Sequence, residues 1–166
     1  MGTGRAYRAT MAKDLLRVEI DGVMYALEVG RIREIVNPLP LIQLPRERAF
    51  VLGVCDYRED VVPVVDLRRF FGLDPAETTR QTKWIIIDAS GRLAGVVVDA
   101  VLDVFSSVAD DRRRVPVLDE RNRERGITTA YRHLENLVFV LDAERLAEPA
   151  LQIPSHELSE LPPEAP

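Results

Sequence analysis

The stretch GVCDYREDVVPVVDLRRFFGL, Gly53 to Leu73, places a charged connection between two apolar runs. Four charged residues lie on that connection: Asp56, Arg58, Glu59 and Asp60. The apolar segment 61–65 follows at once. Apolar, β-branched runs on both sides of a short polar turn are typical of a pair of antiparallel strands. The stretch therefore predicts a hairpin whose turn faces water and is available for recognition.

The composition of the 166 residues fits a globular protein built mostly from strands. Apolar residues make up 46% and aromatic residues only 6%, so Val, Ile and Leu must fill the interior. The formal net charge of −5 argues against nucleic-acid binding, which needs clustered Lys and Arg. The single cysteine, Cys55, cannot form an internal disulfide, and no apolar run is long enough to span a membrane. We expect a cytoplasmic protein with no nucleic-acid partner and no membrane insertion.

The two ends of the chain differ in composition from the middle. Residues 1–14 mix Gly, Arg and Ala without a period and are predicted to be a disordered leader. Residues 148–166 carry five of the eleven prolines and little apolar content, and are predicted to be a disordered tail. The predicted folded part is therefore residues 15–147.

The folded part contains an internal repeat. GVMYALEVGRIREI (Gly22 to Ile35) aligns without gaps with GRLAGVVVDAVLDV (Gly91 to Val104), which places Ile32 on Val101 and Glu34 on Asp103. DVVPVVDLRRFF and NLVFVLDAERLA follow in the same order and place Asp66 on Asp142. Two similar units, about residues 15–73 and 83–147, are each too small for a flat sheet to protect its edges without closing into a barrel. The sequence leaves open whether the units exchange strands.

The residues that usually carry catalysis form no recognisable motif. The two histidines, His133 and His156, are interpreted as surface residues, and neither a zinc, a phosphate-loop nor a serine-nucleophile motif is present. Asp66 and Asp142 are better explained as caps of short helices than as a carboxylate pair. Cys55 is predicted to be a small core residue. The sequence thus predicts no catalytic residue, no metal site and no cofactor.

The segment from Phe50 to Leu73 resembles the signature of CheW-like coupling domains, F-x-x-G-V-x-N-L-R-G-x-V-V-P-V-x-D-L-R-x-x-F-G. The matching positions include Phe50, Gly53, Val54, Arg58, Val62, Pro63, Asp66, Leu67, Arg68, Phe71 and Gly72. The resemblance covers about residues 15–147. It implies an all-β fold of two small, five-stranded SH3-like barrels packed together, with short helical turns.

The resemblance also implies a function. CheW-like proteins are non-catalytic adaptors that bind the regulatory domain of the CheA histidine kinase and the cytoplasmic tip of methyl-accepting chemoreceptors, where they are recruited to receptor arrays. By position in the motif, Arg58 matches the Arg of N-L-R-G, and Glu34 and Ile32 match strand residues of the receptor groove. Val101, the repeat mate of Ile32, is assigned to the same groove. An apolar helix face would lie in this groove, and charge pairs at its rim would fix orientation.

The chain departs from the signature at the hairpin turn, where Asp56, Tyr57, Arg58 and Glu59 replace N-L-R-G. A non-glycine residue costs roughly 1 kcal/mol or more where the backbone needs a positive φ. Either the turn is rebuilt, or φ at Glu59 is ordinary. The change motivates an alternative hypothesis: a diverged CheW-like module that has lost receptor or kinase contact and binds a different protein. An enzyme with an unrecognised site is a third hypothesis.

Overall fold

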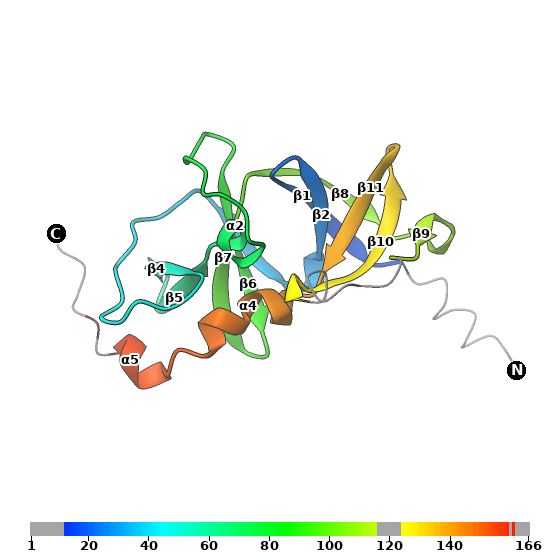
Figure 1. The fold of residues 1–166 in the computed structure, drawn as a ribbon. Helices are drawn as coiled ribbons and strands as arrows, with labels where there is room; N and C mark the ends of the chain where they lie inside the picture. Colours follow the sequence, from blue (N-terminus) through cyan, green and yellow to red (C-terminus); the bar gives the residue numbers. More distant parts are fainter. Residues whose placement is uncertain (1–11, 116–123, 160, 162–166) are drawn as a thin grey trace, which may run out of the picture.

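The computed structural model describes residues 12–115, 124–159 and 161, which fold into two small β-barrels (Figure 1). In chain order the elements are β1 (Asp14–Ile20), β2 (Val23–Glu28), η1 (Val29–Arg31), β3 (Ile32–Val36), β4 (Val51–Tyr57), β5 (Asp60–Val65), α2 (Leu67–Phe70), β6 (Lys83–Ala89), β7 (Arg92–Val98), β8 (Ala100–Ser106), η2 (Ala109–Asp111), β9 (Arg112–Arg113), β10 (Ile127–His133), β11 (Asn136–Leu141), α4 (Ala143–Leu151) and α5 (Ser155–Ser159). Barrel I has the strand order β3-β6-β7-β5-β4, and barrel II has the order β8-β1-β2-β11-β10-β9. The predicted all-β fold with two subdomains is confirmed.

The two barrels exchange strands. Barrel II takes β1 and β2 from the first half of the chain and the rest from the second half, whereas barrel I takes β6 and β7 from the second half. In each barrel one parallel pair joins a strand from the first half of the chain to a strand from the second half. These pairs are β2 with β11, and β5 with β7. Each half of the sequence repeat therefore contributes to both barrels, which answers the question that the sequence left open.

The repeated sequence positions have the same local structure. Gly22 and Gly91 both have positive φ, and each follows a residue with positive φ, as in the two-residue hairpin turns that suit twisted strands. The carboxylate of Asp66 accepts hydrogen bonds from the backbone N–H groups of Arg68 and Arg69. The carboxylate of Asp142 likewise accepts from the N–H of Glu144. Both aspartates are helix caps, as predicted.

The core has one shared layer and two smaller barrel interiors. The shared layer lies between the barrels and combines apolar residues of both, among them Leu16, Leu27, Ile85 and Ile87. The interior of barrel I includes Cys55, Val62, Trp84 and Ile86. The interior of barrel II includes Leu15, Ala26, Phe105 and Val138. Cys55 is a buried core residue, as predicted, and burial raises the pKa of its thiol to about 11, which keeps it protonated and unreactive.

The prediction of a disordered tail from residue 148 is wrong for residues 148–159. Helix α4 continues to Leu151 and packs an apolar face on β5, β6 and β7 of barrel I, and α5 follows (Figure 1). Ile153 is fully buried, and the Arg92 guanidinium donates to the carbonyl oxygens of Leu151 at 2.9 Å and of Ile153 at 3.0 Å. These contacts order a segment whose composition predicted disorder. Residues 162–166 and most of the predicted leader, 1–11, lie outside the described residues.

In the described part of the chain, no helix has the length and apolar character needed to cross a membrane.

Candidate partner-binding site

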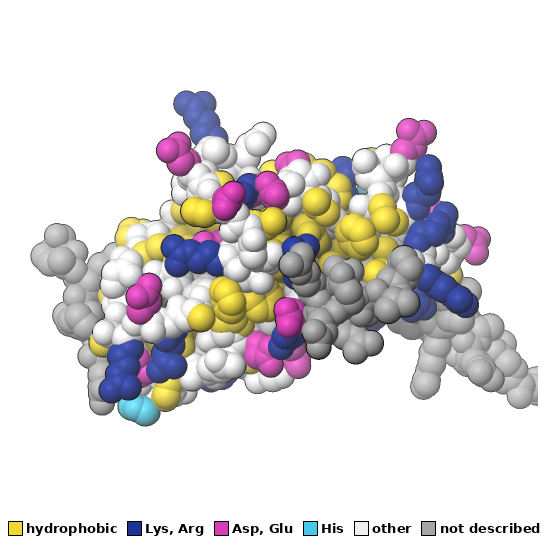
Figure 2. All heavy atoms as spheres, in the orientation of Figure 1, with side chains coloured by type: hydrophobic (Ala, Val, Ile, Leu, Met, Phe, Trp, Pro, Cys, Tyr) yellow, Lys and Arg dark blue, Asp and Glu magenta, His cyan; other side chains and the backbone are white. Residues whose placement is uncertain are grey.

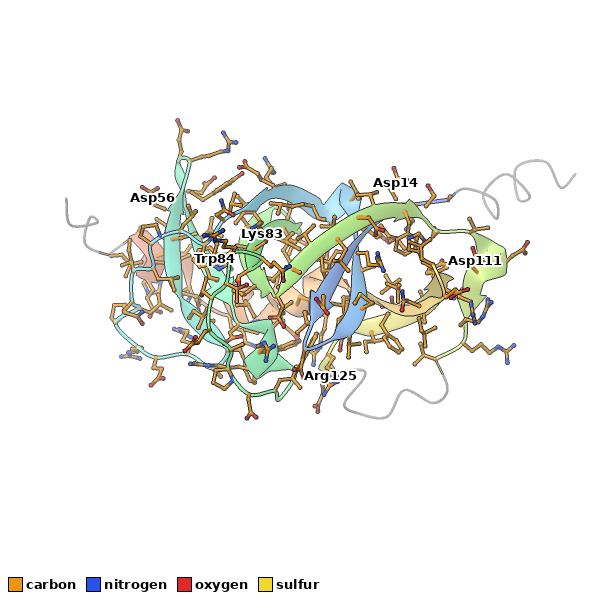
Figure 3. The ribbon with its side chains drawn as sticks, turned by 90° about the horizontal axis from the view of Figure 1, so that it is seen from above. Asp14, Asp56, Lys83, Trp84, Asp111 and Arg125 are labelled. Carbon is orange, nitrogen blue, oxygen red and sulfur yellow. The ribbon has the colours of Figure 1, made fainter. Side chains whose placement is uncertain are left out.

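Strands β3 and β8 carry an exposed apolar surface over the junction of the two barrels. They are equivalent strands of barrel I and barrel II, and both are visible in the view of Figure 3. Ile35 on β3 is 40% exposed, and Leu102 and Val104 on β8 are 42% and 56% exposed. The cross-strand partners of Ile35 and Val104 are Ile85 and Leu16, which belong to the layer between the barrels. Because directly opposed residues share a face of a sheet, the exposed side chains border that layer.

The predicted groove residues Ile32 and Val101 lie at the base of this surface. Both are partly buried and pack against the shared layer from opposite barrels. We use the name β3/β8 surface for the apolar set Ile32, Ile35, Val101, Leu102 and Val104. The structure thus brings Ile32 and Val101 to one region, but the more exposed members of the surface are Ile35, Leu102 and Val104, which the sequence analysis missed. The repeat aligns Ile35 with Val104 just as it aligns Ile32 with Val101, and this was the signal that could have found two of them.

Glu34, Tyr57 and Arg58 meet at the rim of barrel I. The Tyr57 hydroxyl donates to Glu34 Oε1 at 2.7 Å, and Arg58 Nη2 donates to the same oxygen at 2.5 Å. Arg58 Nε donates to the Tyr57 hydroxyl at 3.1 Å, and its guanidinium lies 5.4 Å from the centre of the Tyr57 ring. Since β3 and β4 are the two ends of the strand order, these bonds also close the barrel.

At this rim the carboxylate of Glu34 and the guanidinium of Arg58 form an ion pair. The hydrogen bonds from Arg58, and then from Tyr57, hold the pKa of the Glu34 carboxyl below its usual range. The same bond to Glu34 raises the pKa of Arg58. Glu59 and Asp60 lie close to Arg58 in the sequence, but its described ion-pair partner is Glu34, which lies on another strand.

The altered turn is accommodated without a strained Glu59. Asp56 pairs with Val61 and Tyr57 with Asp60, which leaves Arg58 and Glu59 as a two-residue connection. Arg58 has a φ of 56°, whereas Glu59 is not among the described residues with positive φ. The φ at Glu59 is therefore ordinary, and the unfavourable backbone lies at Arg58. The side chain of Asp56 is exposed on the outer end of β4 (Figure 3).

Barrel II has an equivalent rim, in which a carboxylate on β8 meets an arginine and an aromatic ring. Sequence analysis missed this rim. Asp103 accepts from Arg17 Nε at 2.8 Å and from Arg17 Nη2 at 3.0 Å. His133 Nε2 lies 3.6 Å from Asp103 Oδ2, and the His133 ring stacks on Phe105 with centroids 4.2 Å apart. Tyr57 and His133 are separated by the same number of residues as Asp66 and Asp142, which the repeat aligns. The repeat could therefore have predicted that His133 takes the place of Tyr57 in barrel II. His133 connects β10 to β8 and is 23% exposed, which corrects its interpretation as an ordinary surface histidine.

The described residues contain no group of three or more His, Cys, Asp or Glu side chains placed to hold a metal ion.

Comparison with known proteins identifies the family. Residues 14–150 match the model of the CheW-like domain. The chain is 30% identical over 120 residues to the chemotaxis protein CheW of Rhizobium meliloti, covering 69% of this chain and 76% of that protein. It is 33% identical over 107 residues to the protein FrzA of Myxococcus xanthus, covering 64% of this chain and 62% of that protein.

A solved structure has the same fold. The scaffolding protein TtCheW from Thermoanaerobacter tengcongensis superposes with a TM-score of 0.75 at 21% identity, covering 83% of this chain and 94% of that one. The comparisons favour a coupling adaptor over a diverged module with another partner. With its two exchanged barrels and a match that spans most of its length, the chain belongs to the CheW-like family of chemotaxis coupling adaptors.

Proposed function

We propose that this adaptor couples the cytoplasmic tip of a methyl-accepting chemoreceptor to the regulatory domain of a CheA-type kinase, and that the receptor docks on the β3/β8 surface. CheW-like proteins are non-catalytic scaffolds that couple chemoreceptors to CheA. The observation that supports the proposal for this chain is the apolar β3/β8 surface, which borders the barrel junction next to the Glu34–Arg58 pair. Recruitment to receptor arrays would follow from this contact.

A receptor tip is a helical hairpin, and the β3/β8 surface fits one face of a helix. An amphipathic helix buries its apolar face against a row of exposed apolar side chains, and Ile35, Leu102 and Val104 supply such a row. The rim pair next to it would set the helix orientation. Arg58 is 70% exposed, so an acidic receptor residue can approach its guanidinium from solvent and share it with Glu34.

Binding of the full chain to two separate partners tests this proposal. Isothermal titration with a receptor-tip fragment and, separately, with a CheA regulatory domain gives both affinities. Val104→Glu and Ile35→Glu are expected to weaken receptor binding by about tenfold or more, because a carboxylate would be buried against an apolar helix face. Kinase binding should not change. Val61→Glu is the matched control, since Val61 on β5 is 41% exposed and lies outside the β3/β8 surface.

The reversal Arg58→Glu tests the rim. It removes the cation that Glu34 and the receptor would share, so receptor binding should weaken without loss of fold. Unchanged receptor affinity in both Val104→Glu and Ile35→Glu would reject the docking surface. A wild-type chain that binds neither partner would reject the function itself.

A further inference from the structure

A basic pocket of about 530 Å³ lies beside the connection between β3 and β4, at the end of barrel I that carries α5. Its lining combines arginines with aliphatic side chains, and the residues used below are Leu44, Arg46, Glu47, Arg48, Leu52 and Arg69. We name it the loop pocket. We propose that the loop pocket binds an acidic peptide segment of a partner protein, and that Glu157 of α5 is an internal competitor for the same arginine.

The charge of the loop pocket favours an anionic ligand. Three arginines and one glutamate, Glu47, line it. With Asp66 paired to Arg69, a surplus of one positive charge remains once Glu157 leaves Arg48. Arg46 is exposed and has no carboxylate within ion-pair distance among the described residues, while Arg69 lies 3.4 Å from Asp66. Figure 2 shows basic side chains gathered at the lower left, at this end of the molecule. The aliphatic wall formed by Leu44 and Leu52 suits a peptide that alternates acidic and aliphatic residues.

The protein's own α5 already presents a carboxylate to one of the arginines that line this pocket. Arg48 Nη2 donates to Glu157 Oε2 at 2.6 Å, and the two side chains are only 28% and 16% exposed. Figure 1 shows α5 beside the connection that follows β3. The contact demonstrates that Arg48 can bind a carboxylate in a largely desolvated setting, which is the chemistry that we assign to the partner.

The internal contact is incomplete, and this makes Glu157 a replaceable ligand. Arg48 Nε and Glu157 Oε1 are buried and have no hydrogen-bond partner. A carboxylate that approached Arg48 side-on would satisfy Nε and Nη2 together, as Asp103 does with Arg17 in this same protein. Bidentate pairs of this kind are stronger than single bonds to the same group. A partner carboxylate can therefore outcompete Glu157 at Arg48.

The floor of the pocket is preformed, and α5 can leave without unfolding the chain. The Ile42 and Val54 backbones exchange hydrogen bonds of 2.7 and 2.9 Å, which hold the connection against β4. The preceding segment is fastened separately through buried Ile153 and the Arg92 bonds, whereas α5 contains no buried residue. Release of α5 therefore breaks few contacts. None of these residues belongs to the β3/β8 surface, so this site is separate from the proposed receptor contact.

Peptide binding to the full chain tests the proposal. The probe is a fluorescein-labelled peptide of alternating leucine and glutamate, compared by fluorescence anisotropy with a version in which glutamine replaces glutamate. Glu157→Gln should bind the acidic peptide about tenfold tighter than the wild type, since a competing charged hydrogen bond is removed. Arg48→Gln should lower binding to the level of the glutamine peptide. Glu148→Gln is the control of equal charge, because Glu148 pairs with Arg145 on α4, away from Arg48.

Hydrogen exchange supplies a readout that does not depend on a substitution. Saturating acidic peptide should speed amide exchange in residues 155–159 of the wild type and leave residues 146–153 protected. Continued protection of 155–159 in the bound state would overturn the competition. Equal binding of both peptides, equal affinity of Glu157→Gln and Glu148→Gln, or no binding by Glu157→Gln would overturn the site. Displacement of the peptide by equimolar inorganic phosphate would overturn the peptide as its ligand.

Discussion

Barrel I and barrel II each place a carboxylate on the equivalent strand, Glu34 on β3 and Asp103 on β8, against a ring on β4 or β10. The cation that completes each rim differs in exposure. Arg58 in barrel I is 70% exposed, whereas Arg17 in barrel II is 12% exposed and is held by both Asp103 oxygens. One barrel therefore keeps its cation at the surface, where a partner can share it. The other uses its cation to hold the barrel together.

The hairpin tips differ in side-chain chemistry, although both are exposed. Arg58 stands first in the β4–β5 turn, and Leu134 has the equivalent place in the β10–β11 turn, where it is 66% exposed. Both Leu134 and Glu135 have positive φ, whereas only Arg58 does in the other turn. The repeat has preserved the barrel geometry while the chemistry of its two tips has diverged.

The largest expected effect comes from Gly53, which lies close against a neighbouring backbone in barrel I and is replaced by Thr129 in barrel II. A Cβ at Gly53 would lie 2.7 Å from the Ile42 carbonyl oxygen, and φ there is +151°. Gly53→Ala should therefore lower the free energy of unfolding by about 2–4 kcal/mol, combining overpacking with backbone strain. Thr129, the equivalent position in barrel II, is the control. Urea unfolding of Gly53→Ala and Thr129→Ala compares them, and equal stability would contradict the packing account.

Removing the rim carboxylates should lower stability more in barrel II than in barrel I. Asp103→Asn leaves the largely buried Arg17 without its anion, and we expect a loss of about 1–2 kcal/mol after allowance for the partial exposure of Asp103. Glu34→Gln leaves an exposed Arg58 that water can solvate, so its unfolding midpoint should fall less than that of Asp103→Asn. A lower unfolding midpoint for Glu34→Gln than for Asp103→Asn would contradict the expected difference between the two barrels.

The pH dependence of the free energy of unfolding should reflect the titration of Asp103. The hydrogen bonds from Arg17 hold the pKa of Asp103 below its ordinary value. A depressed folded-state pKa contributes stability that is present above the unfolded pKa of about 4 and is lost as pH falls through the folded value. The stability difference between the wild type and Asp103→Asn should therefore shrink as pH falls below about 4. A difference that is constant from pH 7 to pH 2 would exclude this contribution.

A smaller effect separates the two hairpin turns. Glu135→Gly relieves a positive φ and should stabilise the protein by about 1 kcal/mol. Glu59→Gly relieves no such strain, although the family signature has glycine there, and should be neutral or slightly destabilising. The thermal unfolding midpoints of Glu135→Gly and Glu59→Gly, each compared with that of the wild type, measure both effects. Stabilisation by Glu59→Gly would mean that the turn conformation assigned here is wrong.

The smallest effect concerns the Tyr57 hydroxyl. Arg58 is the main cause of the lowered Glu34 pKa and Tyr57 the second, so Tyr57→Phe should raise that pKa by less than Arg58→Gln does. Carbon-detected NMR titration of the Glu34 carboxyl measures both. A larger rise in Tyr57→Phe would make the tyrosine the dominant partner.

Local patterns explain what the sequence could predict. Repeated apolar runs and aspartates at strand ends predicted the repeated strands and the two helix caps, because each depends on neighbouring residues. The exchange of strands was not predictable, since alternation shows which face of a strand is buried and not which strand it pairs with. For the same reason the sequence could not predict the Glu34–Arg58 pair, because this pair forms only when barrel closure brings β3 to β4.

The ordered segment after residue 148 was missed for a different reason. Its order depends on one fully buried side chain, Ile153, and on backbone carbonyls that accept hydrogen bonds from Arg92. Neither leaves a periodic signal in the sequence, and the prolines nearby indicate a loop. Among the predicted site residues, Arg58, Glu34 and Tyr57 come together at one rim and Ile32 and Val101 at the adjoining surface, while their roles in receptor binding stay predictions.

Methyl NMR of the Ile, Leu and Val side chains during titration with a receptor-tip fragment locates the receptor contact. Docking on the β3/β8 surface should give the largest shift changes at Ile35, Leu102 and Val104, with smaller changes at Ile32 and Val101. Val61 at the β4–β5 hairpin and Leu134 and Leu137 at the opposite barrel rim should stay unchanged. Shift changes confined to Val61, or to Leu134 and Leu137, would contradict docking on the β3/β8 surface.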